Sequence, residues 1–306
     1  MHTSHLEKHI SMVDVEVAGI KHFIASYVLR GRQVALVESG PTSGVASLLS
    51  GLEELKVKPE DVAYVAVSHI HLDHGGGVGT LFKHLPKAKV VVHSRGAVHL
   101  ANPEKLWQQS NAVLGHLAEL YGKPEPVPEE RIVPATDGMA FDLGNCVRLS
   151  VVETLGHASH HLSYCESLSG GVFPGDAAGI YLREKDATVP TTPSPFRLDI
   201  ALASLDKLRK LEPKALFYSH FGKAVNAVDR LDAYEEQLRL WARTAREGVE
   251  KGESLKEIRE RIIQRDKNVR DALEYVRAHP ILGETVLNES LQGVVDFVSR
   301  FKDFSL

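Results

Sequence analysis

The chain has 306 residues, 43% of them hydrophobic and 25% charged, with a formal net charge of -4 at pH 7. This length and apolar content allow a large buried core with room for an appended region. Lys and Arg number 36 against 40 Asp and Glu, so no basic excess exists to bind a nucleic-acid backbone, and no nucleic-acid partner is expected. The first ten residues are polar, no apolar run reaches membrane-spanning length, and the 2 cysteines cannot form a disulfide framework. These features predict a cytoplasmic protein without a membrane anchor.

The first hundred residues alternate between short apolar runs, glycine turns and helical patterns. The apolar runs predict strands over 12–18, 22–29, 33–38, 62–67 and 88–93. Helical patterns lie between them, over 43–55 and 78–85. This alternation of strands and helices predicts a sheet covered by helices.

A ligand-rich stretch directly follows the strand predicted over 62–67. It reads SHIHLDHGGG from residue 68, so three histidines and one aspartate occupy six positions. Loops at strand ends carry chemistry on a rigid scaffold, and in an extended turn His69 and His71 point the same way. Asp73 and His74 are near enough to bind a metal ion at an adjacent position. Because imidazole and carboxylate suit Zn, Mn or Fe, this doubled set predicts a site for two neighbouring metals rather than ordinary surface or core histidines.

Residues 97–131 interrupt the alternation. Pro103 opens a helical pattern that runs to about Tyr121, and a proline-rich segment closes it. One interpretation is a covering helix with ordinary core residues. The other is a lid over the metals, with Trp107 facing the substrate.

Three further predicted strands also end in a histidine or an aspartate. The run over 147–152 leads to His157, the run from 171 leads to Asp176, and the run from 215 ends at His220. Together with the ligand-rich stretch, four separate strand ends present potential metal ligands. That repetition is harder to attribute to chance than any single histidine.

From Lys223 onward no strand pattern appears. Apolar residues such as Leu231, Leu238 and Trp241 follow a helical stripe, and further helices are expected over 255–264, 269–278 and 285–301. The last stripe packs on this chain's own domain or forms the seam of a homodimer. We therefore expect a first domain over 1–222 and a helical region over 223–306.

In chain order, these motifs resemble the metallo-β-lactamase-fold metallohydrolase superfamily. The match runs from Val13 to about Gly222 through Ser39-Gly40-Pro41, the H-x-H-x-D-H stretch, Gly156-His157, Gly175-Asp176 and Ser219-His220-Phe221-Gly222. The resemblance implies an α/β fold, an αββα sandwich of two mixed β-sheets flanked by helices, with a C-terminal all-helical extension placed as in the glyoxalase II-like branch. One departure is Leu155, which stands where a proline commonly precedes the Gly-His turn.

The resemblance also implies a dinuclear metal centre. The superfamily's roles, carried over position by position, assign the first metal to His69, His71 and His157, the second to Asp73, His74 and His220, and the bridge to Asp176. Zinc β-lactamases use a cysteine in the second site, whereas this histidine-rich set is that of the glyoxalase II, lactonase and phosphodiesterase branches. The expected cofactors are two divalent metal ions, zinc first, with iron or manganese as alternatives.

Such a centre predicts a hydrolase that uses a metal-bridging hydroxide on a small ester, thioester or lactone, with promiscuity toward phosphoesters. Asp73 would pass a proton to the leaving group. Tyr181 would stabilise the oxyanion, as a nearby tyrosine does in lactonase-like relatives, or is a core tyrosine. Asp14, Glu38 and Ser39 could each support a ligand imidazole. Two alternatives stay open: a mononuclear iron persulfide dioxygenase and a phosphodiesterase or nuclease of the same superfamily.

Overall fold

The computed structural model describes residues 2–305, with the backbone alone at 284 and 285. The chain forms two compact units, each built from several segments. The first contains the residues up to Glu153, His160–Gly175 and Lys214–Val225; the second contains Thr154–Ser159, Asp176–Pro213 and the chain from Asn226 on. The expected division into 1–222 and 223–306 stays a prediction.

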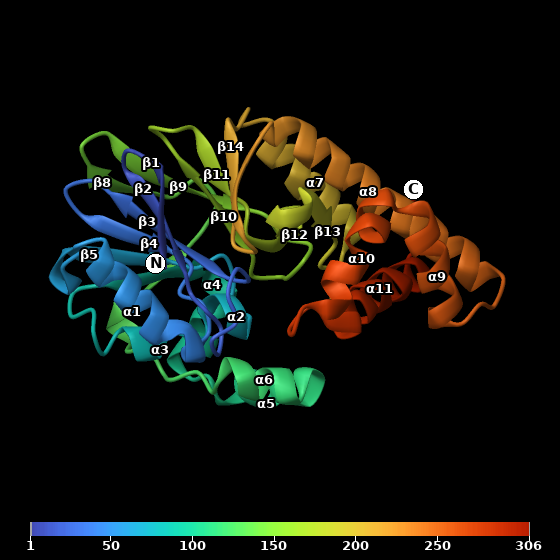
Figure 1. Cartoon of the computed structure of the whole chain (residues 1–306), viewed down its shortest axis with the longest axis horizontal. Helices are drawn as coiled ribbons and strands as arrows, with labels where there is room; N and C mark the ends of the chain where they lie inside the picture. The colour runs from blue at the N-terminus through green and yellow to red at the C-terminus, as the bar shows by residue number, and fades with distance from the viewer. Residues whose placement is uncertain (1, 306) are drawn as a thin grey trace. The chain divides into compact units, whose positions relative to one another are not determined.

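A seven-stranded mixed sheet forms the first layer of the first unit (Figure 1). Its strands follow chain order: β1 (Thr3–Glu7), β2 (Ile10–Asp14), β3 (Ala25–Arg30), β4 (Val34–Val37), β5 (Val62–Ala66), β6 (Lys89–His93) and β7 (Ile132–Ala135). Strands β1 to β4 pair antiparallel, and β4 to β7 pair in parallel. The parallel strands β4 to β6 are nearly continuous apolar runs because both of their faces are covered. The sequence did not predict β1, because this edge strand is polar and half exposed.

Helices of the same unit cover the outer face of this sheet. After one turn of 3-10 helix, η1 (Thr42–Gly44), helix α1 (Val45–Glu54) packs on β2, and α4 (Ser94–Ala101) packs on β6 and β7. A Cβ at Gly51 of α1 would lie 2.3 Å from Cγ1 of Val13. The close contact between this helix and the sheet therefore requires a glycine.

The insertion expected over 97–131 contains two helices instead of one. Gly115, with a φ of 53°, separates α5 (Glu104–Leu114) from α6 (His116–Tyr121), because this left-handed conformation ends a helix. Helix α6 packs against α2 (Leu72–Gly75), and α3 (Val78–Leu81) follows α2 in the chain. Trp107 on α5 is partly exposed. The lid interpretation of this insertion stays a prediction.

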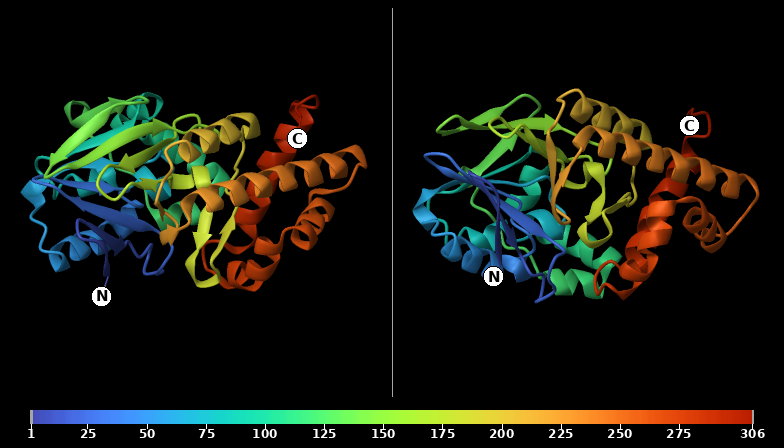
Figure 2. Two further views of the ribbon diagram at one scale, coloured as in Figure 1. Left: turned by 90° about the horizontal axis from the view of Figure 1, so that it is seen from above. Right: turned by 45° about the horizontal axis from the view of Figure 1, so that its top comes forward.

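A six-stranded mixed sheet forms the second layer of the first unit (Figure 2). Its order is β15 (Gly222–Val225), β14 (Ala215–Tyr218), β11 (Gly171–Phe173), β10 (Leu162–Glu166), β9 (Val147–Glu153) and β8 (Ala140–Gly144). Only β11 and β14 pair in parallel. Strand β15 corrects the expectation that no strand follows Lys223. Its run of four residues is too short to show a strand pattern, and its pairing with β14 defines it.

The hydrophobic core lies between these two sheets. The ring of Tyr27 on β3 lies 5.2 Å from that of Phe173 and 5.6 Å from that of Phe217, centroid to centroid. From β10, the Tyr164 hydroxyl donates to the carbonyl oxygen of Val67 over 2.8 Å, just before the ligand-rich stretch. Complete burial raises the pKa of Tyr164 well above its usual value, so its hydroxyl stays protonated as a donor. The second sheet thus anchors the start of the ligand loop.

The second unit is mostly helical. It contains the hairpin β12 (Ile180–Leu182) and β13 (Ala187–Val189), then α7 (Leu198–Arg209), α8 (Ala227–Glu250), α9 (Leu255–Arg265), α10 (Lys267–Ala278) and α11 (Gly283–Arg300). Helix α8 packs against α7, α9 and α11. Buried Asp266 caps α10 through the Val269 amide and accepts a hydrogen bond from Nε1 of Trp241 over 2.7 Å. The C-terminal helical region is therefore confirmed.

Together these elements form the expected α/β fold, an αββα sandwich of two mixed sheets with flanking helices and a helical C-terminal region. Further turns of 3-10 helix occur at η2 (Pro59–Asp61), η3 (Glu129–Arg131), η4 (Gly175–Ala178) and η5 (Arg183–Lys185). Among the described residues, no helix combines the length and the apolar character needed to cross a membrane.

Candidate metal centre

The ligand-rich stretch makes a tight turn between β5 and α2. The amides of His74 and Gly75 donate to the carbonyl oxygen of His71 over 3.0 and 2.9 Å, which closes the first helical turn. A Cβ at Gly75 would lie 2.9 Å from the carbonyl oxygen of His69, so this position favours glycine. Asp73 and His74 consequently lie on a helical turn, whereas His69 and His71 precede it.

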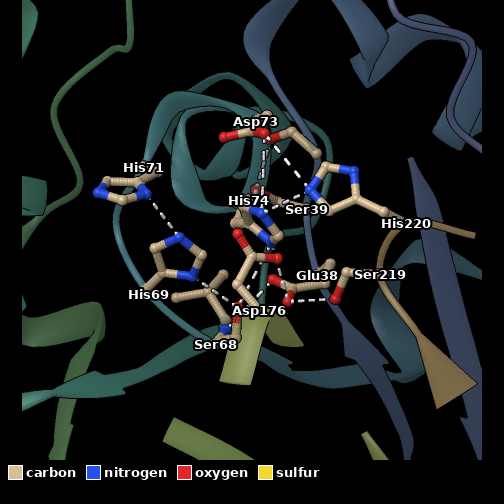
Figure 3. Close-up of polar contacts among 12 residues, drawn as sticks. Glu38, Ser39, Ser68, His69, His71, Asp73, His74, Asp176, Ser219 and His220 are labelled. Carbon is tan, nitrogen blue, oxygen red and sulfur yellow. Dashed lines mark hydrogen bonds and ion pairs between the residues drawn. The ribbon is translucent and has the colours of Figure 1, made fainter. Parts of the chain in front are cut away.

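His69 and His71 face each other with their ring nitrogens. Nε2 of His69 lies 2.8 Å from Nδ1 of His71 (Figure 3). Nδ1 of His69 lies 2.9 Å from the hydroxyl oxygen of Ser68, which leaves Nε2 directed at His71. Two imidazole nitrogens this close can bind one ion.

Asp73, His74 and His220 form a second group in the same unit. Their ligand atoms all lie within 4.8 Å of one another. Nε2 of His220 lies 3.2 Å from Nε2 of His74, and a carboxylate oxygen of Asp73 lies 3.6 Å from the first and 3.7 Å from the second (Figure 3). Both histidines are buried and Asp73 is partly exposed. His74 and His220 thus lie side by side although they are 146 positions apart in the chain.

Glu38 directly follows β4 and contacts this second group at Nδ1 of the His74 ring. One carboxylate oxygen lies 3.2 Å from Nδ1 of His74 and accepts a hydrogen bond from the Ser219 hydroxyl over 2.9 Å. The other oxygen accepts from the Ser68 amide over 3.2 Å. Glu38 is fully buried, with a φ of 71°. The sequence could not distinguish Glu38 from the other candidates, Asp14 and Ser39. It also did not indicate Ser68 or Ser219, although each directly precedes a predicted ligand.

The other two candidates have different contacts. The hydroxyl of Ser39 donates to the carbonyl oxygen of His74 over 2.7 Å, so it supports the backbone of a predicted ligand. Asp14 accepts hydrogen bonds from the amides of Glu16 and His22, and burial raises the pKa of its carboxyl group. Among the described contacts, those of Asp14 involve none of the predicted ligands.

The second unit contains the remaining two predicted ligands, His157 and Asp176. Nε2 of His157 lies 3.4 Å from a carboxylate oxygen of Asp176, and both side chains are buried. Nδ1 of His157 lies 2.9 Å from the carbonyl oxygen of Thr191. The structure therefore brings five predicted ligands together in the first unit and two in the second.

The turn that carries His157 depends on the preceding glycine. Gly156 has a φ of 129°, and a Cβ there would lie 2.6 Å from the backbone N and Cα of Ala201 in α7. The carbonyl oxygen of Leu155 accepts a hydrogen bond from the Ser204 hydroxyl over 2.6 Å. Contacts with α7 thus hold this turn although the common proline is absent.

The chemistry of the donors fits divalent metal ions. For His74, His220 and His157, the ring nitrogen Nδ1 faces an acceptor: the carboxylate of Glu38, the carbonyl oxygen of Phe23 at 3.2 Å and that of Thr191. A proton on Nδ1 leaves the lone pair of Nε2 free, which is the form that binds a metal. Neutral imidazoles with carboxylates beside them form a ligand set typical of zinc and related ions.

Tyr181 lies on β12 in the second unit. Its hydroxyl donates to the carboxylate of Asp186 over 2.7 Å, and the guanidinium of Arg230 lies 5.1 Å from the ring centroid. Burial and Asp186 raise the pKa of Tyr181 to about 12, so the hydroxyl stays protonated at neutral pH. Its role as an oxyanion donor stays a prediction.

The sandwich and these donors define an α/β protein with a histidine and aspartate cluster capable of binding metal. The family model of the metallo-β-lactamase superfamily matches residues 20–220. The chain belongs to this superfamily. It is 30% identical over 201 residues to the metallo-β-lactamase fold-containing protein ST1585 of Sulfurisphaera tokodaii, an alignment that covers 64% of this chain and 72% of the relative.

Solved structures have the same fold. The crystal structure of ST1585 from Sulfolobus tokodaii, an archaeal metallo-β-lactamase superfamily protein, has a TM-score of 0.65 and 24% identity, covering 76% of this chain and 87% of that one. The metallo-β-lactamase family protein TTHA1429 from Thermus thermophilus has a TM-score of 0.66 and 20% identity, with 91% and 89% covered. The family and the metal-binding cluster together support a metal-dependent hydrolase.

Proposed function

We propose that this protein is a dinuclear metal-dependent hydrolase of a small ester, thioester or lactone, in the glyoxalase II and lactonase-like branch. The group of Asp73, His74 and His220 carries this proposal, because it supplies a ligand set for a second ion beside the one that His69 and His71 begin. The alternative, a mononuclear iron dioxygenase of the same superfamily, keeps much of this ligand set but binds one iron through two histidines and one aspartate, so the number of bound ions separates the two functions. The net charge of -4 also favours a small substrate over a nucleic acid.

His157 and Asp176 would complete the centre. The segment that carries His157 directly follows β9, and Asp176 follows β11 by three residues. The covalent chain therefore holds both near the carboxyl ends of strands in the second sheet. We assign His157 to the first ion, with His69 and His71, and Asp176 to the bridging position.

When bound, two divalent ions would polarise the substrate carbonyl and lower the pKa of a water molecule. The residues of the chain have separate tasks. Glu38 keeps the His74 ring in one orientation, and buried imidazoles exclude bulk water from one side of the centre. The partly exposed carboxylate of Asp73 is proposed to take up a proton and deliver it to the leaving group. Tyr181 would donate to the oxyanion after its hydroxyl leaves Asp186.

The deciding experiment is metal content per chain, measured by elemental mass spectrometry on protein purified without added metal. We expect about two zinc ions per chain, or a mixed pair, and turnover of at least one substrate in a panel of thioesters, lactones and phosphoesters. Close to one iron per chain, with oxygen uptake on glutathione persulfide, would overturn the proposal in favour of the dioxygenase.

Asp176→Ala tests the assignment of the bridge. We expect this variant to lose one or both metals and most of the activity, because a bridging carboxylate would be a ligand of both ions. The matched control is Asp303→Ala, which removes an exposed carboxylate near the end of the chain. If Asp176→Ala kept the metal content and rate of the control, the assignment would be wrong.

A further inference from the structure

A cavity lies in the first unit, at the starts of β4, β5 and β6. It has a volume of about 310 Å³. Besides Gln33 and Ala63, its lining contains one tyrosine and five charged side chains: Tyr64, Arg32, Glu60, Asp61, Lys87 and Lys89. We call it the strand-start cavity. The ligand loop follows the other end of β5, and a strand of this length spans about 17 Å. The cavity is therefore separate from the candidate metal centre and matches the size of a small-molecule site.

The five charged side chains around the cavity are all exposed. Across residues 2–305, none of them makes an ion pair or a side-chain hydrogen bond. By contrast, Arg209 pairs with both Asp232 and Glu235. The charges around the strand-start cavity are consequently available to a ligand.

Their order across the sheet is cation, acid, cation. Arg32 lies in the turn that leads into β4, Glu60 and Asp61 lie in η2 before β5, and Lys87 and Lys89 lie at the start of β6. Because β4, β5 and β6 are consecutive neighbours, Arg32 and the lysines are two strand spacings apart, about 10 Å. This order fits a molecule that has an anionic group at each end and hydroxyl groups between them.

Two of the lining residues are held in place by the fold. The amide of Arg32 donates to the carbonyl oxygen of Leu143 over 2.6 Å. The Arg32 stem lies against Gly144, where a Cβ would be 2.7 Å from Cγ of Arg32. The ring of Tyr64 lies 5.0 Å from that of Phe141 on the opposite sheet and forms an aromatic floor. Such preorganisation lowers the entropic cost of binding.

We propose that the strand-start cavity binds a small metabolite with an anionic group, phosphate or carboxylate, at each end and hydroxyl groups between them. Arg32 binds one anionic group, and Lys87 with Lys89 binds the other. Glu60 and Asp61 accept hydrogen bonds from the hydroxyl groups of the ligand. Since none of these residues belongs to the candidate metal centre, this ligand binds without displacing the substrate.

Isothermal titration calorimetry on the metal-loaded full chain tests this proposal with three probes. Fructose 1,6-bisphosphate presents two phosphates with hydroxyl groups between them, galactarate presents two carboxylates with hydroxyl groups, and adipate presents two carboxylates alone. We expect one or both hydroxylated probes to bind at least tenfold more tightly than adipate, and the tighter of them identifies the anionic group. Absence of binding by both hydroxylated probes would overturn the proposal.

Charge variants show where the probe binds. The double variant Lys87→Gln/Lys89→Gln should weaken binding at least tenfold, whereas Lys256→Gln/Lys302→Gln, which removes two exposed charges elsewhere, should change it less than twofold. His71→Ala should leave the affinity unchanged. Equal losses in both double variants would indicate non-specific charge attraction, and loss of binding in His71→Ala would place the probe at the metal centre. Either result would contradict the proposal.

Discussion

Glu38 is a buried acid in a left-handed conformation, a combination that is costly unless the surroundings compensate for it. Its two oxygens contact the His74 ring, the Ser219 hydroxyl and the Ser68 amide, so the negative charge is shared among three partners. Two of these partners directly precede His69 and His220 in the chain. One carboxylate therefore links two of the segments that carry predicted ligands, the ligand-rich stretch and the segment of His220.

Glu38→Gln should weaken metal binding at the second position by about tenfold or more, because the neutral amide no longer polarises the His74 ring. The change keeps the size of the side chain, so packing is largely preserved. Competition between the protein and a chromophoric zinc chelator measures the affinity. Glu250→Gln, at an exposed glutamate near the end of α8, is the control. Equal affinities in the two variants would exclude this role for Glu38.

At this scale, the sequence pointed to candidate ligand residues but did not single out the side chains that support them. His69, His71, Asp73 and His74 were recognisable because they crowd into one motif, and His220 because it ends a strand as they do. The pairing of Glu38 with Ser219 was not predictable, since these residues are 181 positions apart and no pattern connects them. Only the stacking of the two sheets brings them together.

At the scale of elements, the turns that follow strands carry predicted metal ligands, so the conformation of these turns decides where the ligands lie. The Gly156 turn packs its backbone directly on α7 and leaves no room for a side chain. Gly156→Ala should therefore lower the free energy of unfolding by about 1–3 kcal/mol. It should also reduce the metal content, because His157 is the next residue. Chemical denaturation and elemental analysis measure the two effects.

Gly252→Ala separates the steric effect from backbone strain. Gly252 also has a left-handed backbone, with a φ of 71°, but no atom lies within 4 Å of the position of a Cβ. The control should be less destabilising than Gly156→Ala and should keep its metals. Equal destabilisation would show that backbone strain alone, without the contact to α7, explains the effect.

Two tyrosines, one on the hairpin of β12 and β13 and one on α10, make the second unit less stable at alkaline pH. Burial raises the pKa of Tyr181 to about 12, and the neighbouring Asp186 adds to the shift. Burial likewise raises the pKa of Tyr275 on α10 to about 12, with a further contribution from Glu184 beside it. The folded chain thus holds these protons more tightly than the unfolded chain, in which the pKa is about 10. The resulting stabilisation is complete below pH 10 and is lost as the pH rises toward 12.

The free energy of unfolding should accordingly fall by about 1 kcal/mol between pH 9 and pH 11.5, since Tyr275 is partly exposed and solvent screens its contribution. Urea denaturation at several pH values measures this slope. The double variant Tyr181→Phe/Tyr275→Phe should flatten it, and its stability at pH 8 reports the packing effect of removing the hydroxyls. An unchanged slope in the double variant would contradict the assignment to these tyrosines.

Element boundaries were predictable where the apolar run is strong, as in β5 and β9. They were not predictable where pairing alone defines the element. Strand β1 is polar and β15 has only four residues, and each is defined by its pairing with β2 or β14. The sequence predicted an extended turn where the helical turn α2 lies, since a ligand-rich and glycine-rich segment carries no helical periodicity.

At the scale of the whole molecule, the number of bound metals separates the hydrolase from the dioxygenase. His220 belongs to the second ligand group alone, and it comes from the last strand-end motif of the chain. In the dinuclear hydrolase, His220→Ala should reduce zinc from about two to about one ion per chain and lower kcat/KM by about a hundredfold or more. Elemental mass spectrometry and initial rates with the best substrate of the panel measure both effects.

His84→Ala is the matched control, because it removes an exposed histidine outside the ligand groups. It should keep both metals and the full rate. In a mononuclear iron enzyme, by contrast, His220→Ala would keep its single iron and much of its activity, because the first ligand group is untouched. If His220→Ala retained the full metal content and rate, His220 would be excluded as a ligand. The assignment of the second ion to Asp73, His74 and His220 would then be wrong.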